Sequence, residues 1–282
     1  MEPHHIDVSA QTFWDAYEKF WNVETPTTEK QLSTQTFRVI TPFYNVQDFI
    51  DLPIFSLQNQ INENFKCYLI DDCSNDKSVN IAINTINHDN RFTLTQNTEK
   101  KYALENIAST IDSIEDIDDE DIILMLDGDD WLSSKNVLSH LEKTYNDEQC
   151  LVTYGSYAYF PTGQKGVEPS TYPEQVIKNN AFRHDRWRAS HLRTFKYKLW
   201  KQINHDDLKG SDGYYKVAYD QAVMLPLLEM AASRSRYIPE VLYVYNRLNP
   251  LNVDKIKVKE QQQAAFEIRN KEPYKGCDQF EY

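Results

Sequence analysis

The segment that decides the fold reads Ile122-Ile-Leu-Met-Leu-Asp-Gly-Asp-Asp-Trp131. Its first half is an unbroken apolar run, Ile122–Leu126, which is typical of a strand buried on both faces within a parallel sheet. Its second half places three carboxylates around Gly128 as soon as that run ends. A buried strand that opens into clustered carboxylates predicts an α/β sheet with a polar site at the carboxyl end of the strand.

The chain before this segment alternates between strand and helix patterns. Short apolar runs predict strands, and apolar residues three and four positions apart predict the helices between them. The strands are expected at Phe37–Thr41, Phe65–Ile70 and Arg91–Thr95, and the helices at Ile50–Ile61, Ser78–Asn87 and Ala103–Ile114. This alternation favours βαβ units and a mostly parallel, doubly wound sheet flanked by helices.

Polar residues occur where three of these strands end. They are Thr41-Pro-Phe-Tyr-Asn45, Asp71-Asp-Cys-Ser-Asn-Asp76 and Asp127-Gly-Asp-Asp-Trp131. Because ligands bind beyond the carboxyl ends of parallel strands, we expect one site here. Asp-x-Asp on a turn permitted by Gly128 suits a hard divalent cation that bridges to a diphosphate. The alternative is that these residues only cap helices and form turns.

Glycine usage narrows the ways in which the chain can bind a nucleotide. There are only seven glycines in 282 residues, all of them after Leu126, and no two form Gly-x-Gly. The dinucleotide fingerprint and the P-loop both need closely spaced glycines, so both are excluded.

A second acidic stretch, Glu115–Asp121, has six acids in seven residues and precedes a strand. We expect it to be a solvated loop rather than a metal site.

Charge and composition restrict the class of protein further. The net charge of −13 argues against broad nucleic-acid binding, which needs a basic surface. The longest apolar run has five residues, against the about 20 that span a bilayer, and the first residues form no secretory signal. With four cysteines and no Cys-x-x-Cys pair, the sequence predicts a reduced, cytoplasmic protein without a transmembrane segment.

Two further segments flank the alternating region. Aromatic residues at helical spacing predict an amphipathic helix over Ala10–Val23, and the polar stretch Glu24–Thr36 is expected to be a linker. Residues Lys255–Asn270 predict a helical tail. The expected division is therefore an N-terminal extension (1–36), an α/β domain (37–252) and a C-terminal helical tail (253–282).

Four motifs together resemble the inverting glycosyltransferases of family 2. They are Val39-Ile-Thr-Pro-Phe-Tyr-Asn45, Ser56-Leu-Gln-Asn-Gln60, Ile70-Asp-Asp-Cys-Ser-Asn-Asp76 and Leu126-Asp-Gly-Asp-Asp-Trp131, and the resemblance extends from Phe37 to about Asn252. It implies the GT-A fold, which is Rossmann-like, in a single catalytic domain. It also implies a nucleotide-sugar donor, usually a UDP-sugar, a hydroxyl acceptor such as a saccharide, and a Mn²⁺ or Mg²⁺ ion.

The same resemblance implies roles for residues at the strand ends. Asp72 is expected to accept a hydrogen bond from the uracil ring. Asp127 and Gly128 are expected near the ribose, with Asp127 and Asp129 holding the metal on the diphosphate. The residues expected around the base and ribose are Thr41, Pro42, Tyr44 and Asn45.

The second half of the chain contains a basic segment, Asp185–Lys196, within an acidic protein. It resembles the His-Leu-Arg-Thr-Phe segment of a subset of these transferases. Clustered Arg and His favour a diphosphate or an anionic acceptor, so His191 and Arg193 are candidates, with Trp187 as a candidate for stacking on a sugar. The alternative is a surface loop that balances neighbouring acids.

The segment Val217–Met230 matches the place where the family carries its catalytic base. Asp220 opens this otherwise apolar helix and is the candidate base that deprotonates the acceptor hydroxyl. The alternative is that Asp220 is the N-cap of the helix.

The chain departs from the family pattern at two places. Where the family often has Ala-Arg-Asn, this chain has Leu104-Glu-Asn106, so Lys100 or Lys101 is expected to replace the arginine. No histidine follows His205, and Asp254 stands where the family's metal-binding histidine is expected. Asp254 is thus a candidate third ligand, because carboxylates suit Mn²⁺ and Mg²⁺, and water is the alternative.

The expected function is metal-dependent transfer of a sugar from a nucleotide diphosphate sugar to an acceptor hydroxyl, with inversion. Two alternatives remain open: a protein that binds nucleotide sugars without catalysis, and a sugar nucleotidyltransferase. The second is disfavoured because Thr41–Asn45 replaces the Gly-rich basic loop that it needs.

Overall fold

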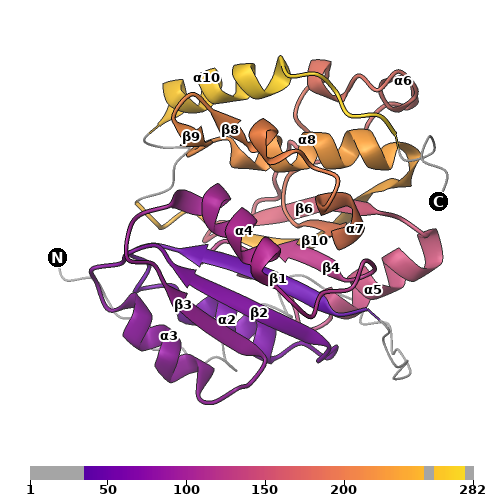
Figure 1. The fold of residues 1–282 in the computed structure, drawn as a ribbon. Coiled ribbons are helices and arrows are strands. Elements are labelled where there is room, and N and C mark those ends of the chain that lie inside the picture. Colours follow the sequence, from indigo (N-terminus) through magenta and orange to yellow (C-terminus); the bar gives the residue numbers. More distant parts are fainter. Residues whose placement is uncertain (1–34, 251–256, 277–282) are drawn as a thin grey trace.

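The computed structural model of the chain describes residues 35–250 and 257–276. The helix expected over 10–23 therefore lies outside the described residues. An eight-stranded sheet with helices on both faces forms the centre of the molecule (Figure 1). In spatial order its strands are β3 (Phe92–Gln96), β2 (Phe65–Asp71), β1 (Phe37–Phe43), β4 (Ile122–Met125), β7 (Arg193–Lys196), β6 (Val152–Phe160), β10 (Ser235–Asn246) and β5 (Trp131–Leu132).

Helices cover the sheet on its two faces as separate layers (Figure 1). One face carries α2 (Asp51–Gln58), α3 (Ser78–Ile86) and α5 (Val137–Glu148), and the other carries α4 (Tyr102–Ser113), α7 (Tyr197–Trp200), α8 (Tyr219–Ala231) and α10 (Val258–Arg269). The remaining elements of the described chain are a short helix α6 (Glu174–Lys178), a small ribbon of β8 (Lys209–Gly210) and β9 (Gly213–Tyr214), and the 3-10 helices η1 (Phe182–His184), η2 (His205–Leu208) and η3 (Ala232–Arg234).

Strand β1 shows why the sheet needs both layers. Its side chains alternate between faces, so Val39 joins the apolar cluster of α2 and α5 while Ile40 joins the cluster of α4 and α8. Both residues are fully buried. This is the pattern of a strand that is covered on both faces, as the continuous apolar runs predict.

Strand directions explain how distant segments reach one edge of the sheet. Strands β1, β2 and β4 run parallel, with Phe43 opposite Asp71 and Ile40 opposite Met125. Strand β7 runs antiparallel to β4, with Arg193 opposite Met125, so the start of β7 lies where β4 ends. The predicted GT-A-like fold, a mostly parallel sheet flanked by helices, is confirmed, with β7 and β5 as antiparallel members.

The helix predicted over Ile50–Ile61 is shorter than expected at its C-terminal end. Helix α2 ends at Gln58, and Ile61 is 55% exposed rather than packed. The backbone N–H of Ile61 donates to the carbonyl of Lys135 at 2.8 Å. A contact with a distant loop therefore takes Ile61 out of the helix, although its spacing fits the helical pattern.

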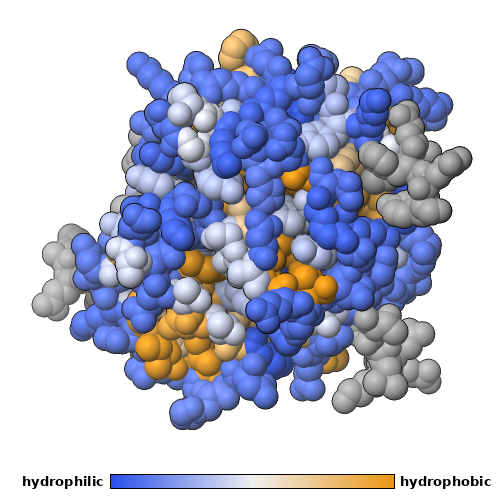
Figure 2. All heavy atoms as spheres, viewed as in Figure 1, coloured by the Kyte–Doolittle hydropathy of each residue, from blue (hydrophilic) through white to orange (hydrophobic). Residues whose placement is uncertain are grey.

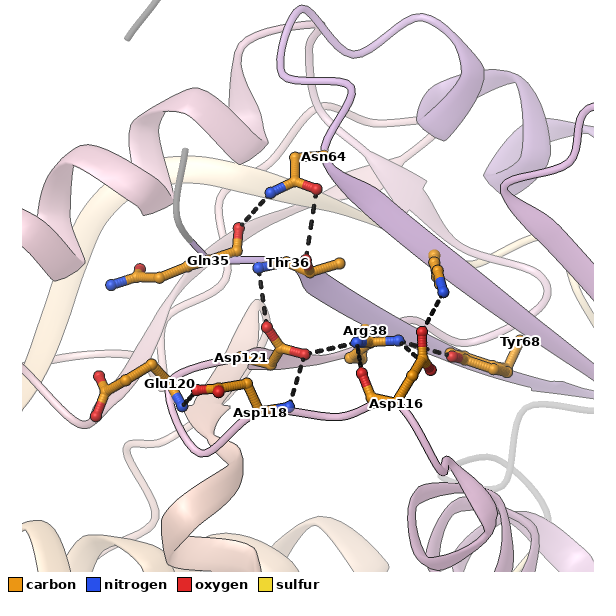
Figure 3. Close-up of polar contacts among 10 residues, drawn as sticks. Gln35, Thr36, Arg38, Asn64, Tyr68, Asp116, Asp118, Glu120 and Asp121 are labelled. Carbon is orange, nitrogen blue, oxygen red and sulfur yellow. Dashed lines mark hydrogen bonds and ion pairs between the residues drawn. The ribbon is translucent and has the colours of Figure 1, made fainter. Parts of the chain in front are cut away.

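The acidic stretch at 115–121 is not simply a solvated loop. Asp121 is buried at the amino end of β4 and accepts hydrogen bonds from Arg38 at 2.8 Å and from the backbone N–H of Thr36 at 3.0 Å (Figure 3). Asp116 pairs with Arg38 at 3.0 Å and also with Lys66. The stretch thus fixes the start of β1, at the end of the sheet opposite the predicted site.

The C-terminal helix α10 packs against α8. Arg183 and Glu229 form a buried ion pair at 2.6 Å beneath it, and the Arg183 guanidinium also donates to the carbonyl of Ile268 at 2.6 Å. The backbone N–H of Tyr274 donates to Glu229 at 2.9 Å. The end of the described chain is therefore attached to the middle of the molecule.

Most of the visible surface is hydrophilic, and the main apolar area lies over α3 and β3 (Figure 2). Ile83 of α3 is 53% exposed there. Among the described residues, no helix combines the length and apolarity that a bilayer crossing requires.

Candidate active site

The turn after β4 brings the Asp127–Asp130 carboxylates against residues from α8 and β10. The Asp127 carboxylate accepts hydrogen bonds from the hydroxyls of Tyr219 at 2.6 Å and Tyr243 at 3.4 Å. The Asn249 side-chain amide donates to Asp129 Oδ2 at 2.7 Å. Neutral donors therefore contact both carboxylates that are expected to hold a metal.

Asp130 is a structural member of this turn, although the sequence motifs assign it no role. It is buried, and its two oxygens accept hydrogen bonds from the Tyr243 hydroxyl at 2.6 Å and the Asn246 backbone N–H at 2.7 Å. Burial, together with the charges of Asp129 and Asp127, raises the pKa of Asp130 well above its usual range. Asp130 thus attaches the turn to β10, and its position directly after the Asp-x-Asp motif was the only sequence signal.

Gly128 is required for a different reason from the one expected. Its φ does not lie in the left-handed region, where the described glycines are Gly163 and Gly213. A Cβ at position 128 would instead lie 2.3 Å from Phe43 Cβ and 3.1 Å from the Pro42 carbonyl oxygen. The backbone N–H of Gly128 donates to that carbonyl at 3.2 Å. Close approach to β1, and not turn geometry, therefore excludes a side chain.

Asp220 lies in the first turn of α8 and faces Arg193. The helix begins at Tyr219 and its N-cap is Ala218, so the N-cap alternative for Asp220 is wrong. The Arg193 guanidinium lies 3.7 Å from Asp220 Oδ2, and its Nη2 is 2.9 Å from His191 Nε2. The structure thus brings Asp220, Arg193 and His191 together, as the antiparallel direction of β7 requires.

The surroundings of His191 and Arg193 contradict the surface-loop alternative. Both side chains are buried, and the imidazole stacks on Tyr243 with a centroid distance of 4.4 Å. Burial and the charge of Arg193 lower the pKa of His191 well below its ordinary value. Among the described residues, Arg193 Nε has no hydrogen-bond partner. Arg193 is therefore a buried cation whose nearest carboxylate is Asp220.

The loop after β1 is joined to the loop after β2 through Asn45. Its backbone N–H donates to Ser74 Oγ and its side-chain oxygen accepts from the Asn75 backbone N–H, both at 2.9 Å. Thr41 is fully buried, with its hydroxyl 3.9 Å from Cys67 Sγ, so it presents no surface to a ligand here. Pro42 is also buried in β1, and its carbonyl receives the Gly128 N–H.

Asp72 anchors the start of α4. Its carboxylate accepts hydrogen bonds from the backbone N–H groups of Lys101 at 2.8 Å and Tyr102 at 3.0 Å, and from the Asn97 amide at 3.1 Å. Burial opposes ionisation, but these donors outweigh it and lower the pKa of Asp72. The backbone of Lys101 is thus bound to Asp72.

Two aromatic candidates lie in different surroundings. The Lys100 ammonium lies over the ring of Tyr44 and 5.6 Å from the ring centroid of Tyr102. Trp187 is half-buried and packs against the apolar cluster of α4 and α8. Lys100 and Tyr44 therefore meet at the edge where Asp72 lies, whereas Trp187 contributes to the core.

The described residues contain no group of three or more His, Cys, Asp or Glu side chains arranged to hold a metal ion. Asp254, the expected third ligand, lies outside the described residues. Tyr219 and Tyr243 contact the aspartates directly but carried no motif, so sequence reasoning did not find them. The only local sequence signal for Tyr219 is that it directly precedes Asp220, and Tyr243 has none.

Sequence comparisons relate the chain to known glycosyltransferases. The sequence model described as Glycosyl transferase family 2 matches residues 38–220. A relative from Haemophilus influenzae, named as an uncharacterized glycosyltransferase, is 33% identical over 126 residues. The match covers 43% of this chain and 46% of the relative, so the chain spans about half the length of that protein.

Solved structures show the same fold at low identity. S. aureus TarS, crystallised with UDP-GlcNAc, has a TM-score of 0.63 at 18% identity, over 83% of this chain and 64% of that one. The mannosyltransferase PcManGT from Pyrobaculum calidifontis, in complex with GDP-Man and Mn²⁺, has a TM-score of 0.58 at 14% identity, over 94% and 73% of the two chains. Because the family model covers well over half of the chain, this protein belongs to glycosyl transferase family 2.

Proposed function

We propose that this protein transfers a sugar from a nucleotide diphosphate sugar, a UDP-sugar, to an acceptor hydroxyl with inversion at the anomeric carbon. One observation carries the proposal. Tyr219 bonds to Asp127 at 2.6 Å, which holds the expected base, its neighbour Asp220, beside the expected metal turn. The proposal is supported by family membership and by solved relatives in complex with UDP-GlcNAc and with GDP-Man.

The donor set of the turn fits a divalent metal. Asp127 and Asp129 supply hard carboxylate oxygens two residues apart, which Mn²⁺ and Mg²⁺ prefer. In the described part of the chain Asp127 forms no ion pair, and its bonded partners are the neutral hydroxyls of Tyr219 and Tyr243. Asp127 and Asp129 would hold the ion, with Asp254 as a proposed third ligand. The ion would neutralise charge that develops on the leaving diphosphate.

The side chains around Asp220 surround the place proposed for the acceptor hydroxyl, which attacks the anomeric carbon. The acceptor oxygen forms a bond to the anomeric carbon as the bond from that carbon to the diphosphate breaks, and Asp220 takes the hydroxyl proton. Arg193, buried and 3.7 Å away, lies beside the carboxylate of Asp220 and limits the directions in which it can turn. His191, held neutral by burial and by Arg193, adds no competing positive charge.

We propose that residues 37–252 form the catalytic domain. We also propose that the tail, 253–282, stabilises this domain through the contacts of α10. The Arg269 guanidinium supports this role. It donates to Gln221 at 2.8 Å, next to Asp220, and to the carbonyl of Asp185 at 2.7 Å. Arg269 of α10 thus contacts the residue next to Asp220 and the start of the basic segment Asp185–Lys196.

The decisive experiment measures UDP or GDP release from a panel of nucleotide sugars, with Mn²⁺, with Mg²⁺ and with EDTA. We expect metal-dependent turnover of a UDP-sugar, and NMR of the product should show the inverted anomer. Tight binding of a nucleotide sugar without turnover under any condition would favour a non-catalytic binding protein. If no nucleotide sugar is bound or turned over, and metal makes no difference, the proposal is wrong.

The role of Asp220 has its own test. Asp220→Asn keeps the shape but removes the base, so transfer should fall at least about 100-fold while UDP–metal binding changes little. Asp207→Asn, at a half-buried carboxylate that accepts a hydrogen bond from the Tyr274 hydroxyl and has no contact with Asp127 or Arg193, is the matched control and should keep its activity. Loss of UDP binding in Asp220→Asn would show instead that Asp220 is a structural group or a ligand.

A further inference from the structure

Three lysines from distant segments gather around one aromatic ring at the start of α4. The ammonium groups of Lys100, Lys216 and Lys257 lie 5.6, 5.1 and 5.7 Å from the ring centroid of Tyr102. A positive charge near an aromatic ring is attracted by the electron-rich face of the ring. Tyr102 therefore acts as the common support of a cationic cluster in a protein whose net charge is −13.

Two of the three lysines in this cluster have no acidic partner among the residues that the structure describes. Lys100 and Lys216 are exposed, and within residues 35–250 and 257–276 neither of them forms an ion pair. Lys257 has one, with Glu260 at 3.7 Å on the following helical turn. Each of the three ammonium groups lies within 5.7 Å of the same ring centroid, although their long side chains have open solvent available. Such a cluster creates a local positive potential that attracts an anion.

The position of the lysine cluster connects it to the proposed active site. The backbone N–H of Tyr102 donates to Asp72, the residue expected at the nucleotide base. On the other side, Lys216 precedes Tyr219 by three residues, and the Tyr219 hydroxyl contacts Asp127. Three residues span at most about 11 Å. The cluster therefore adjoins Asp72 through Tyr102 and is joined by a short segment to the residue that contacts the Asp127 turn.

We propose that Lys100, Lys216 and Lys257 form a phosphate-binding site at the rim of the active site. The inference rests on the proposed function for its role and extends it. His191 and Arg193, the basic residues that the sequence favours for an anion, are buried and engaged with each other and with Asp220. Lysine ammonium groups bind phosphate as point charges. The phosphate has two possible sources, the diphosphate of the donor and a phosphate on the acceptor.

The test is calorimetric binding of inorganic pyrophosphate to the full chain in EDTA, where no metal can contribute. The triple variant Lys100→Gln, Lys216→Gln, Lys257→Gln should bind pyrophosphate at least tenfold more weakly than the wild type. The control variant Lys143→Gln, Lys165→Gln, Lys178→Gln removes the same charge elsewhere and should change the affinity less than twofold. Equal affinities in wild type and triple variant, or equal losses in both variants, would overturn the proposal.

A second titration identifies the source of the phosphate. If UDP displaces pyrophosphate from the wild type, the site binds the donor diphosphate, and if pyrophosphate still binds at saturating UDP, the site serves a phosphorylated acceptor. Both results support the lysine site. Pyrophosphate binding is measured without turnover. If the lysine site binds pyrophosphate but the protein turns over no nucleotide sugar, the proposed function is wrong and the lysine site stands.

Discussion

Tyr219 links the two carboxylates on which the proposed reaction depends, one through its hydroxyl and the other through the backbone. It donates to Asp127 at 2.6 Å, and the next residue along the chain is Asp220. The preceding residue, Ala218, has a φ of 51°, so the chain enters α8 through a left-handed turn. That turn and the Tyr219 hydroxyl fix the direction in which the first turn of α8 presents Asp220.

Replacing Tyr219 with Phe removes this hydroxyl and keeps the ring. A hydrogen bond to a charged group contributes about 1.5–3 kcal/mol, so we expect kcat to fall roughly 10- to 100-fold with little loss of stability. The metal concentration needed for half-maximal activity should also rise, because Asp127 loses its shortest bond. Tyr237→Phe, which loses a 3.0 Å bond to Ser156 far from the aspartates, is the control. Unchanged kinetics in Tyr219→Phe would show that the contact has no role in positioning.

Gly128→Ala tests the close approach between the aspartate turn and β1. The added Cβ would lie 2.3 Å from Phe43 Cβ, so the turn must shift away from β1. We expect metal-dependent UDP binding to weaken at least about tenfold, since displacement of even about 1 Å is costly at a catalytic site. In Gly276→Ala the added Cβ would lie 3.8 Å from its nearest neighbours, so this variant should behave like the wild type. Equal UDP binding in both variants would contradict the packing argument.

At the scale of elements, α8 is the helix that α10 and the following segment hold in place. Its interior carries the buried carboxylate of Glu229, which pairs with Arg183 and also accepts the backbone N–H of Tyr274. Burial raises the pKa of Glu229, and the charge and hydrogen bonds of Arg183 oppose that effect. Both members of this buried ion pair must be present, because an unpaired buried charge is strongly unfavourable.

Glu229→Gln breaks this pair and leaves the Arg183 guanidinium buried without its counter-charge. We expect the free energy of unfolding to fall by about 3–5 kcal/mol, measured by urea denaturation. Glu174→Gln breaks the exposed Glu174–Lys178 pair and should change it by less than about 1 kcal/mol. A loss in Glu229→Gln as small as in Glu174→Gln would mean that the pair does not hold α10 onto α8.

At the scale of the whole molecule, an imidazole and a guanidinium are buried together at the edge of the sheet that carries the Asp127–Asp130 turn. His191 lies there among Tyr157, Tyr243 and Tyr245, with Arg193 as its charged neighbour. Protonation of this imidazole would place a second positive charge beside a buried guanidinium. The stability of the fold should therefore depend on pH through His191.

The sign of this dependence follows from the lowered pKa of His191 in the folded state. Below about pH 6.5 the unfolded chain binds the proton and the folded chain does not, so stability is full above that pH and falls as the pH drops. Between about pH 7 and pH 5.5 the wild type should lose roughly 1 kcal/mol more than His191→Gln. Urea denaturation at several pH values measures the difference. Parallel pH profiles for the two proteins would contradict the burial of a neutral imidazole.

The sequence by itself determined the layered fold and the position of the Asp127–Asp130 turn. These are local properties: apolar runs fix buried strands, and parallel strands bring their carboxyl ends to one edge. Family membership followed from the same motifs and is confirmed. The roles of the residues at that edge stay predictions.

Only the tertiary structure decided what surrounds those carboxylates. The direction of β7, opposite to β4, buries His191 and Arg193 beside Asp220, and no local pattern indicates strand direction. Contacts between segments about 90 to 150 residues apart bring Tyr219 to Asp127 and Lys257 to Tyr102. Such contacts depend on how the layers pack, and the free energy of packing is shared by the whole core. The sequence therefore locates the reactive carboxylates, and the packed fold determines their partners.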